Sequence, residues 1–311
     1  MDPLSDRAMK IIGTYLFISG IFSGFLNYND GWNSLIKLSA TPRLGLMASN
    51  LMMAVFHPIM GAPIFTQRWP WGKTGCSVVG SFWLFFGLIH LINTAFKALV
   101  DARLTLHPDS PSVQKWEAHL PRYQICIMIW AAVWASIPAL LMSNSGTLHY
   151  QPHCRIIWAD AGKAYAVYVT AMFIFHWLTP VVITVKSYLA VWHCAKAQDN
   201  LKVPWAFQQH LGKTMIVRTA LTYVPYGVYG VFLFLGMAVP GKLNPRYIII
   251  PSLATKSLSF IHPILHVFAN PILFHCLKMW VGAKLKPNGE VGVAMGEVPE
   301  TLPDFAREIV V

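Results

Sequence analysis

Charged residues are scarce in this 311-residue sequence. Asp, Glu, Lys and Arg make up only 12% of it, whereas 55% of its residues are hydrophobic. A soluble domain carries about 25% charged residues, so the composition excludes an ordinary soluble domain and indicates an integral membrane protein. Acidic residues are rarer than basic ones, with 13 Asp and Glu against 24 Lys and Arg. The basic residues are scattered, so the net charge of +11 does not indicate a nucleic-acid partner.

Several kinds of site are missing as well. The sequence shows no metal-binding cluster, no nucleophile–base pair and no phosphate-binding glycine loop, so metal and hydrolytic chemistry have no support. It contains no Asn-x-Ser/Thr sequon, and no N-linked glycan is predicted. The start of the chain does not read as a signal peptide, and the stretch from Ile11 onward reads as a signal anchor.

Long apolar stretches are abundant. A helix needs about 20 apolar residues to cross a bilayer, and seven stretches approach or exceed this length. They cover roughly Ile11–Ile36, Leu44–Phe65, Gly75–Val100, Tyr123–Met142, Tyr165–Trp192, Met215–Val239 and Tyr247–Phe274. The first is the weakest, because the polar run Asn27–Gly31 interrupts it. We therefore predict an all-α membrane protein with a seven-transmembrane helix bundle.

The predicted bundle occupies residues 1–286, and residues 287–311 form a polar cytoplasmic tail that we expect to be disordered. A short amphipathic helix is expected after the seventh span. Lys and Arg are more frequent in the loops on one side of the membrane. The positive-inside rule then places the N-terminus in the extracellular space or lumen and the C-terminus in the cytoplasm, in a plasma or intracellular membrane whose lipids are partners.

The sequence has five cysteines. Cys76 lies at the outer end of the third span and Cys154 in the next outer loop, both on the oxidising side, so we predict a disulfide between them. Cys126 lies within a span, and Cys194 is expected to face the cytoplasm. Cys276, just beyond the last span, is a candidate for palmitoylation, with a plain reduced thiol as the alternative.

Lys256 stands near the middle of the last apolar stretch. A lysine at bilayer depth costs at least ~2.5 kcal/mol to insert, so it requires a partner, a water path or a chemical modification. Snorkelling to the headgroups is a long reach from this position. A buried primary amine is also the group that condenses with an aldehyde to form a Schiff base.

The residues around Lys256 resemble those of animal opsins, which belong to the rhodopsin-like receptors. Opsins carry a lysine followed six residues later by Asn-Pro-x-x-Tyr, and here His262-Pro263-Ile264-Leu265-His266 follows Lys256 at that spacing. Further segments similar to opsins are Gly72–Cys76 with Cys154, His176–Pro180 with Tyr188, and Thr222–Tyr226. Arg68–Gly72 and Phe82–Gly87 look most like the branch of retinochromes, retinal photoisomerases and peropsins.

This resemblance implies a photopigment whose chromophore, 11-cis or all-trans retinal, is bound to Lys256 as a Schiff base. It also implies a chromophore pocket lined by Phe82, Phe86, Gly87, His176, Trp177, Tyr223 and Tyr226. Ordinary helix packing is the alternative role of these aromatic residues. Light would change the chromophore isomer, and the bundle would respond through proline kinks in its helices.

The positions that act as a switch in opsins are altered here. Opsins that couple strongly to G proteins end their third helix in Asp/Glu-Arg-Tyr, but that position here reads Val100-Asp101-Ala102, and Asp101-Ala102-Arg103 is a scrambled version of the motif. His262 and His266 replace the Asn and Tyr of the motif around Pro263. Tyr188 is retained. These departures favour a light-driven retinal isomerase or weak signalling over strong coupling to a heterotrimeric G protein.

The carboxylates that neutralise the Schiff base in opsins are missing, because those positions are Val79 and Leu148. A protonated imine in a medium of low dielectric needs a negative partner, and without one the neutral form is favoured. Our hypothesis is a neutral imine in the dark that absorbs ultraviolet light. Asp160 in an outer loop is the candidate counterion, and chloride, His90, His149 or His153 would be further groups that tune the site.

Two other functions remain open on the sequence. The first is a rhodopsin-like receptor for a non-retinal small molecule, in which Lys256 pairs with solvent or with an acid of the ligand. The second is a transporter that uses Lys97, Lys186 and Lys256 as charges within the membrane.

Overall fold

The computed structural model of the chain describes residues 10–15, 18–21, 41–66, 70–107, 110–111, 115–116, 118–142, 162–197, 205–238, 253–259, 261–262 and 264. These residues form helices and turns, with no strand among them. The chain divides into two compact units, Met1–Pro263 and Ile264–Val311, and the packing described below lies within the first. The predicted domain boundary at residue 286 and the amphipathic helix after the seventh span fall outside the described residues.

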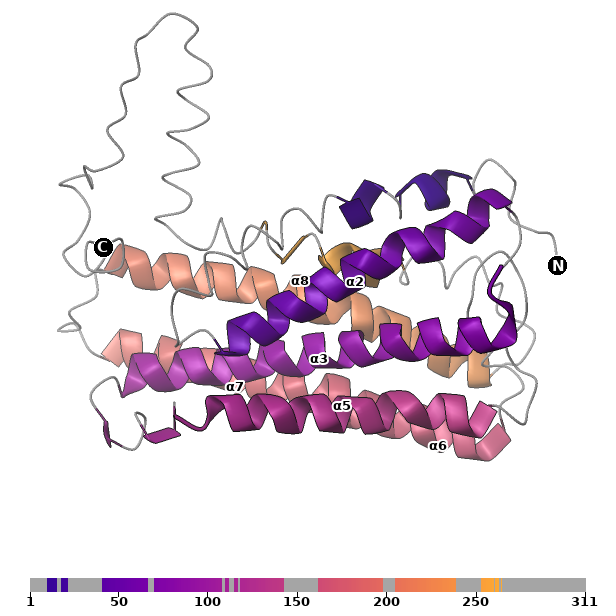
Figure 1. Cartoon of the computed structure of the whole chain (residues 1–311). Coiled ribbons are helices and arrows are strands. Elements are labelled where there is room, and N and C mark those ends of the chain that lie inside the picture. Colours follow the sequence, from indigo (N-terminus) through magenta and orange to yellow (C-terminus); the bar gives the residue numbers. More distant parts are fainter. Residues whose placement is uncertain are drawn as a thin grey trace, which may run out of the picture. The chain divides into compact units, whose positions relative to one another are not determined.

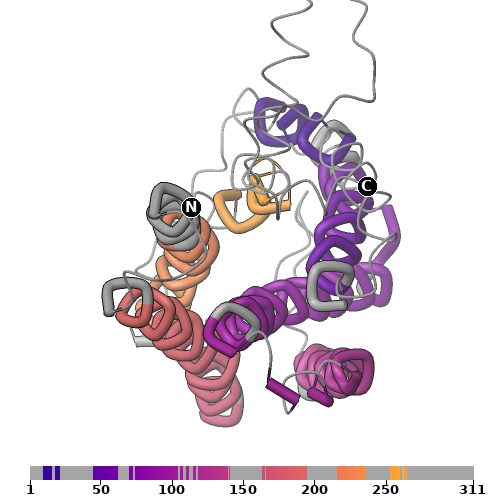
Figure 2. The backbone as a smooth tube through the Cα atoms, turned by 90° about the vertical axis from the view of Figure 1, so that its left-hand side faces the viewer, coloured from indigo at the N-terminus to yellow at the C-terminus, as the bar shows by residue number. Residues whose placement is uncertain are grey.

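The second to sixth predicted spans form long helices that run side by side (Figure 1), and Figure 2 looks along them. They are α2 Thr41–Thr66, α3 Gly72–Leu106, α5 Leu120–Met142, then α6 Gly162–Phe173, a π-helical turn η2 Ile174–Leu178 and α7 Thr179–Ala197, and finally α8 Trp205–Ala238. Residues 10–15, 18–21 and 253–259, from the first and seventh predicted spans, are also helical. Helix α8 begins before its predicted span, in a polar stretch whose composition alone suggests a loop.

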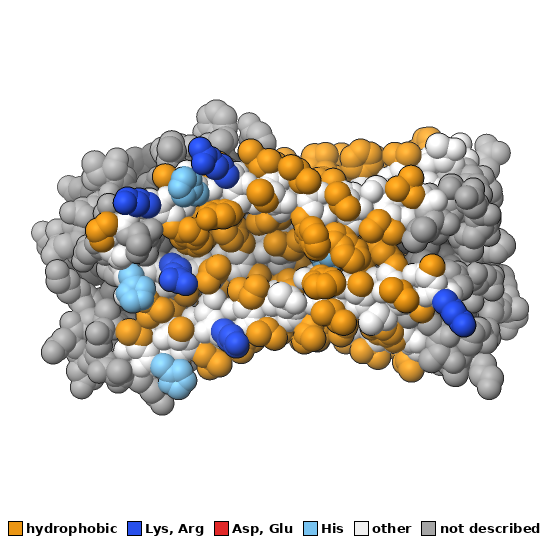
Figure 3. Space-filling model, turned by 90° about the horizontal axis from the view of Figure 1, so that it is seen from below, with side chains coloured by type: hydrophobic (Ala, Val, Ile, Leu, Met, Phe, Trp, Pro, Cys, Tyr) orange, Lys and Arg blue, Asp and Glu red, His pale blue; other side chains and the backbone are white. Residues whose placement is uncertain are grey.

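The helices have the lengths and surfaces that a membrane requires. Within the described residues, three helical stretches are long and apolar enough to cross a bilayer, namely Thr74–Arg103, Leu120–Pro138 and Ala166–Cys194, and Gly45–Gly61 is a shorter apolar helix. Apolar side chains cover the middle of the face in Figure 3, whereas the described Lys and Arg side chains on it lie towards its ends. This distribution is expected of helices that face lipid.

Helix α3 occupies the centre of the bundle and packs against α2, α5 and α7. Its 35 residues extend about 52 Å at 1.5 Å per residue, more than the ~30 Å hydrocarbon core of a bilayer. Ala95, Ala98 and Ala102 follow one another at helical spacing and are almost fully buried. Small residues at this spacing let neighbouring helices approach closely, so α3 can pass between its neighbours.

Two local backbone features determine where α3 begins and how α6 continues into α7, the helices that carry the site. Gly72, with φ of +61°, makes the turn into α3 in a backbone conformation that favours glycine. The π-helical turn ends two residues before Pro180, which has no N–H to continue an α-helical ladder. The backbone N–H and the hydroxyl of Thr179 both donate to the carbonyl of Ile174, five residues earlier. The widened turn changes the direction in which His176 and Trp177 point relative to α6.

Candidate functional site

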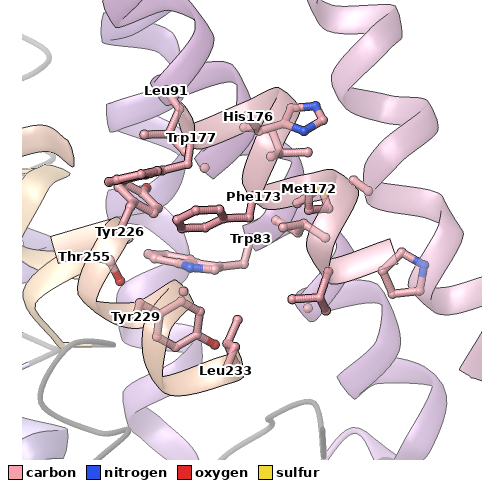
Figure 4. A pocket seen from close by; sticks show the side chains of 18 of the residues that line it. Trp83, Leu91, Met172, Phe173, His176, Trp177, Tyr226, Tyr229, Leu233 and Thr255 are labelled. Atoms are coloured by element: carbon pink, nitrogen blue, oxygen red, sulfur yellow. The ribbon is translucent and has the colours of Figure 1, made fainter. Parts of the chain in front are cut away.

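A cavity of about 250 Å³ lies between the helices. Residues of α3, α5, α6, η2 and α8 line it, together with residues of the segment 253–259 and Met60 of α2. The lining is mostly apolar and aromatic. In Figure 4, Trp83 of α3, Phe173 of α6, Trp177 of η2 and Tyr226 of α8 approach one another, whereas the ring of His176 points away from them.

Lys256 brings a primary amine to the wall of this cavity. Its Nζ lies 5.6 Å from the centroid of the Trp83 ring, within the roughly 6 Å range of a cation–π interaction. Two serines that follow Lys256 form hydrogen bonds next to it. The hydroxyl of Ser257 is hydrogen-bonded to that of Tyr15, and the hydroxyl of Ser259 donates to the Lys256 carbonyl at 3.0 Å.

The wall at Trp177 is closely packed. Its Nε1–H donates to the backbone carbonyl of Tyr223 at 2.7 Å, and its ring stacks on Phe173 with a centroid distance of 4.5 Å. A Cβ atom at Gly227 would lie 2.6 Å from Cζ2 of Trp177, so glycine is what allows the indole to lie against α8. A Cβ atom at Gly230 would likewise lie 2.9 Å from Phe173. These contacts fix the position of both rings.

The structure brings most of the residues implied by the resemblance to one place. Lys256 and four of the predicted pocket residues line the cavity, namely Gly87, His176, Trp177 and Tyr226. Three predicted pocket residues do not line it, namely Phe82, Phe86 and Tyr223.

Helical geometry explains these three exceptions. Phe82 and Phe86 are turned away from the face of α3 that carries Trp83 and Gly87, and both lie close to Phe56, with ring centroids at 5.7 and 6.2 Å. Tyr223 is one turn of α8 away from Tyr226, and its hydroxyl bonds Thr184 at 3.1 Å and donates to the Leu91 carbonyl at 3.2 Å.

Sequence reasoning missed Trp83 and Phe173, which both line the cavity. A usable signal existed for each. Trp83 precedes Gly87 by four residues and follows Cys76 by seven, so a helix places all three on one face. Phe173 precedes Trp177 by four residues. The distance between Trp83 and Lys256 depends on how two helices pack, and no spacing within the sequence predicts it.

His176 is almost fully buried, with 1% of its surface exposed. Its ring packs against both Trp130 and Trp134 of α5, at centroid distances of 6.0 and 5.0 Å. His176 therefore contributes an aromatic surface to the end of the cavity next to α5.

A second polar group of residues joins three helices in the interior of the bundle. Nε2 of His262 lies 2.7 Å from the hydroxyl of Thr222 and 3.2 Å from Nε2 of His90. The two imidazole rings meet edge to face, with an interplanar angle of 82°. His262, predicted as part of the altered switch motif, thus links its own segment to α3 and α8.

The remaining switch residues within the described part lie on α3 and α7. Asp101 forms an ion pair with Lys97, one turn earlier on α3, and Arg103 is exposed near the end of α3. Tyr188 of α7 is hydrogen-bonded to Thr219 of α8. Pro263 and His266 lie outside the described residues, so the role predicted for them stays a prediction.

The cysteine predictions are only partly covered. Cys76 is buried, and the free cysteines of the described part are Cys126 and Cys194. Cys154 and Cys276 lie outside the described residues, so the disulfide and the palmitoylation stay predictions. Asp160, the candidate counterion, lies outside them too. Asp101 is the one carboxylate in the described part of the chain, and no metal-binding group of His, Cys, Asp or Glu occurs there.

Comparison with known proteins agrees with the resemblance read from the sequence. No protein-family model matches the chain. The visual pigment-like receptor peropsin of Homo sapiens is 22% identical over 292 residues, which cover 86% of this chain and 82% of peropsin. Peropsin of Mus musculus is 23% identical and covers 84% and 81%. The red-sensitive opsin of Oryzias latipes is 24% identical over 187 residues, or 56% of this chain and 51% of the opsin.

The structural comparison concerns the fold. Squid rhodopsin superposes with a TM-score of 0.74 at 16% sequence identity, over 96% of this chain and 95% of the rhodopsin. This confirms the predicted all-α, rhodopsin-like seven-helix fold, which is that of a membrane protein. The chain is thus similar to animal opsins, peropsins among them, and has the fold of a rhodopsin-like receptor.

Proposed function

We propose that the chain is a retinal-binding photopigment in which Lys256 carries the chromophore. The observation that supports this is a primary amine in the wall of an apolar, aromatic cavity. Such an amine condenses with an aldehyde, forming a C=N bond and releasing one water molecule. Retinal is an apolar polyene that ends in an aldehyde, so this lining and this amine fit it. Similarity to a visual pigment-like receptor points in the same direction.

The cavity walls suggest how a polyene would be held. Phe173 and Trp177 are fixed against α8 and offer flat apolar surfaces. At Gly87 a Cβ atom would come within 3.6 Å of the Tyr226 hydroxyl, so the absence of a side chain there leaves space between α3 and α8. We propose that these four residues bind and orient the chromophore and exclude water from it.

The chemical test is covalent attachment. The full chain in lipid nanodiscs is incubated with 11-cis or all-trans retinal, reduced with borohydride and analysed by mass spectrometry. We expect one retinyl group on Lys256, none in Lys256→Ala, and a normal yield in Lys186→Ala, whose lysine is exposed on α7. Retinal bound by Lys256→Ala as by the parent, or no adduct in the parent, would contradict the proposal and favour a receptor for a non-retinal ligand.

We further propose that the imine is neutral in the dark and absorbs in the ultraviolet. The support is the scarcity of carboxylates: Asp101 is paired with Lys97 and lies 18 residues, or about 27 Å of helix, from Trp83. Absorption spectra of the loaded protein across pH test this. A visible band at neutral pH that is lost in Asp160→Asn would instead establish Asp160 as the counterion.

We infer that the response to light is isomerisation of retinal or weak signalling. The support is the altered switch, in which Asp101 pairs within α3 and His262 stands where opsins have asparagine. Illumination followed by retinal extraction, and nucleotide exchange on a heterotrimeric G protein, separate the two. All-trans retinal converted to 11-cis without exchange supports the isomerase, and rapid exchange supports a signalling receptor.

The orientation and the modifications complete the proposal. Exposed basic residues of the described part, among them Arg103, Lys115 and Arg122, gather where α3 ends and α5 begins, which supports a cytoplasmic location for that side. The N-terminus would then be extracellular or lumenal. We also propose the Cys76–Cys154 disulfide and a palmitate on Cys276. Peptide mapping with and without reductant tests the disulfide. Peptide mapping with and without hydroxylamine, which cleaves thioesters, tests the palmitate.

A further inference from the structure

The indole of Trp83 lies close to two basic side chains. Nζ of Lys256 is 5.6 Å from the centroid of its ring, and the imidazole of His57 is 5.2 Å from it, tilted by 35°. Trp83 and Lys256 both line the cavity, whereas His57 does not. An indole face carries the negative part of the ring quadrupole, and among aromatic side chains it attracts cations best. The position of this ring therefore affects the charge of Lys256.

The other groups that surround Lys256 offer little compensation for a positive charge. Among the described residues that line the cavity beside Lys256 and Trp83 there is no Asp or Glu. The carboxylate of Asp101 is paired near the far end of α3. In the part of the chain that the structure describes, the indole is thus the group placed to favour a cation at this nitrogen.

We propose that Trp83 is a positioning residue whose indole face stabilises positive charge on the nitrogen of Lys256, and that His57 holds the indole there. For the free amine this inference needs no chromophore; for the imine it rests on the proposed function. A cation–π contact raises the proton affinity of the nitrogen by about 2-fold when it is exposed and by about 30-fold when it is desolvated. A carboxylate in contact would raise it by about 1,000-fold at an effective dielectric constant of 20. The indole is therefore a weak substitute, which agrees with a largely neutral imine at neutral pH.

The role of His57 follows from its packing. It is fully buried, and neither ring nitrogen has a hydrogen-bond partner among the described residues. The segment around Gly20 packs closely against the backbone of α2 at this point. A Cβ atom at Gly20 would lie only 2.9 Å from the Cβ of His57 and 2.7 Å from Pro58. The imidazole has no room to withdraw on that side. It therefore supports the indole mainly as a flat ring of fixed position.

The test measures the amine directly, without retinal. The full chain in nanodiscs is dimethylated with ¹³C-formaldehyde and borohydride, and the methyl signal of Lys256, assigned by its loss in Lys256→Arg, is followed by NMR across pH. We expect Trp83→Leu to lower the proton affinity of this amine about 10-fold, and Trp83→Phe to lower it about 2- to 3-fold, because phenylalanine keeps a weaker π face. Phe82→Leu, at an exposed neighbour outside the cavity, should leave it unchanged.

The same titration in two further variants examines His57. We expect His57→Ala to lower the proton affinity of the Lys256 amine, but by less than Trp83→Leu does. His57→Phe keeps a flat ring and should leave this proton affinity unchanged. Trp83→Leu titrating like the parent overturns the inference, and if that variant does not fold, a folded Trp83→Phe with an unchanged titration overturns it equally. If the Lys256 amine titrates alike in the parent and in His57→Ala, His57 has no part in positioning Trp83.

The chromophore-loaded arm separates this inference from the proposed function. Titration of the retinal imine by absorbance should show the same order, with the parent highest, Trp83→Phe next and Trp83→Leu lowest. Absence of any borohydride-reducible retinal adduct in the parent would refute the proposed function, while the NMR titration of the amine would still decide the role of Trp83. An adduct whose imine titrates alike in parent and Trp83→Leu refutes only the role of Trp83.

Discussion

The buried pair His90 and His262 should respond unequally to the same substitution. The Thr222 hydroxyl donates its proton to the Arg218 carbonyl at 2.8 Å, so its oxygen accepts from Nε2–H of His262. Nε2 of His90, 3.2 Å from the same nitrogen, is then an acceptor. The proton of His90 accordingly resides on Nδ1, where no hydrogen-bond partner lies among the described residues.

The magnitudes follow from these contacts. His90→Leu, a substitution of similar volume, loses one shared hydrogen bond worth about 0.5–1.5 kcal/mol but also removes a buried, unpartnered N–H that costs about 1–3 kcal/mol. We expect a change in unfolding free energy within about 1 kcal/mol of zero. His262→Leu removes the contacts to Thr222 and His90 and leaves both nitrogens of His90 without a partner among the described residues, so we expect a loss of about 2–4 kcal/mol.

Thermal unfolding of the variants in nanodiscs, followed by tryptophan fluorescence, measures the asymmetry. A change of 1 kcal/mol moves the midpoint by about 2–4 °C for a large domain, so His262→Leu should unfold at least about 4 °C earlier and His90→Leu within about 4 °C of the parent. The double variant should be more stable than the sum of the two single effects by about 1–3 kcal/mol, because the residues are in contact. Equal losses in the two single variants, or simple additivity, would refute the assignment of donor and acceptor.

Two further predictions concern the cavity wall and the ion pair. Gly227→Ala would place a Cβ atom 2.6 Å from Trp177, so we expect a loss of about 1–3 kcal/mol and less retinyl adduct, whereas Gly80→Ala, with open space around it, should gain about 0.5–1 kcal/mol from helix propensity. Equal thermal midpoints for the two would contradict this. Asp101→Asn deprives the largely buried Lys97 of its charged partner. We expect it to lower the unfolding free energy by about 1–3 kcal/mol, a value between those of exposed and buried ion pairs. Adding Lys97→Met should restore part of this stability. No recovery in the double variant would contradict an ion-pair effect.

The sequence predicts the helices well because one physical quantity, apolar length, decides them. It predicts their ends less well: α8 starts at Trp205 within a polar stretch, because a helix that leaves the membrane no longer needs apolar residues to continue. The π-helical turn before Pro180 also carries no composition signal. It arises because proline removes an N–H from the α-helical ladder.

The site was predictable to the extent that a motif fixes the face of a helix. The stretch around Phe82 and Phe86 matches a family pattern, but the match does not say which of its aromatics face inward. A helix turns 100° per residue, so the face that carries Gly87 also carries Trp83, four residues earlier, and not Phe86, one residue earlier. The contact between Trp83 and Lys256 joins residues 173 positions apart and depends on packing between helices.

The scarcity of carboxylates also bears on how a ligand in the cavity would influence the rest of the bundle. Trp177 lines the cavity and donates a hydrogen bond to the backbone carbonyl of Tyr223. The Tyr223 hydroxyl is hydrogen-bonded to α3 and α7, and the neighbouring Thr222 is hydrogen-bonded to His262. Each of these is a hydrogen bond between groups without formal charge, worth about 1 kcal/mol, rather than a buried ion pair worth several. A displacement of Trp177 that altered one to three such bonds would shift a two-state equilibrium by about 5- to 150-fold. That shift changes a minor population measurably but does not convert 1:99 into 99:1, which needs about 10⁴-fold. A shift of this size supports the proposed function of a weakly signalling pigment or of one whose main product is the isomerised chromophore.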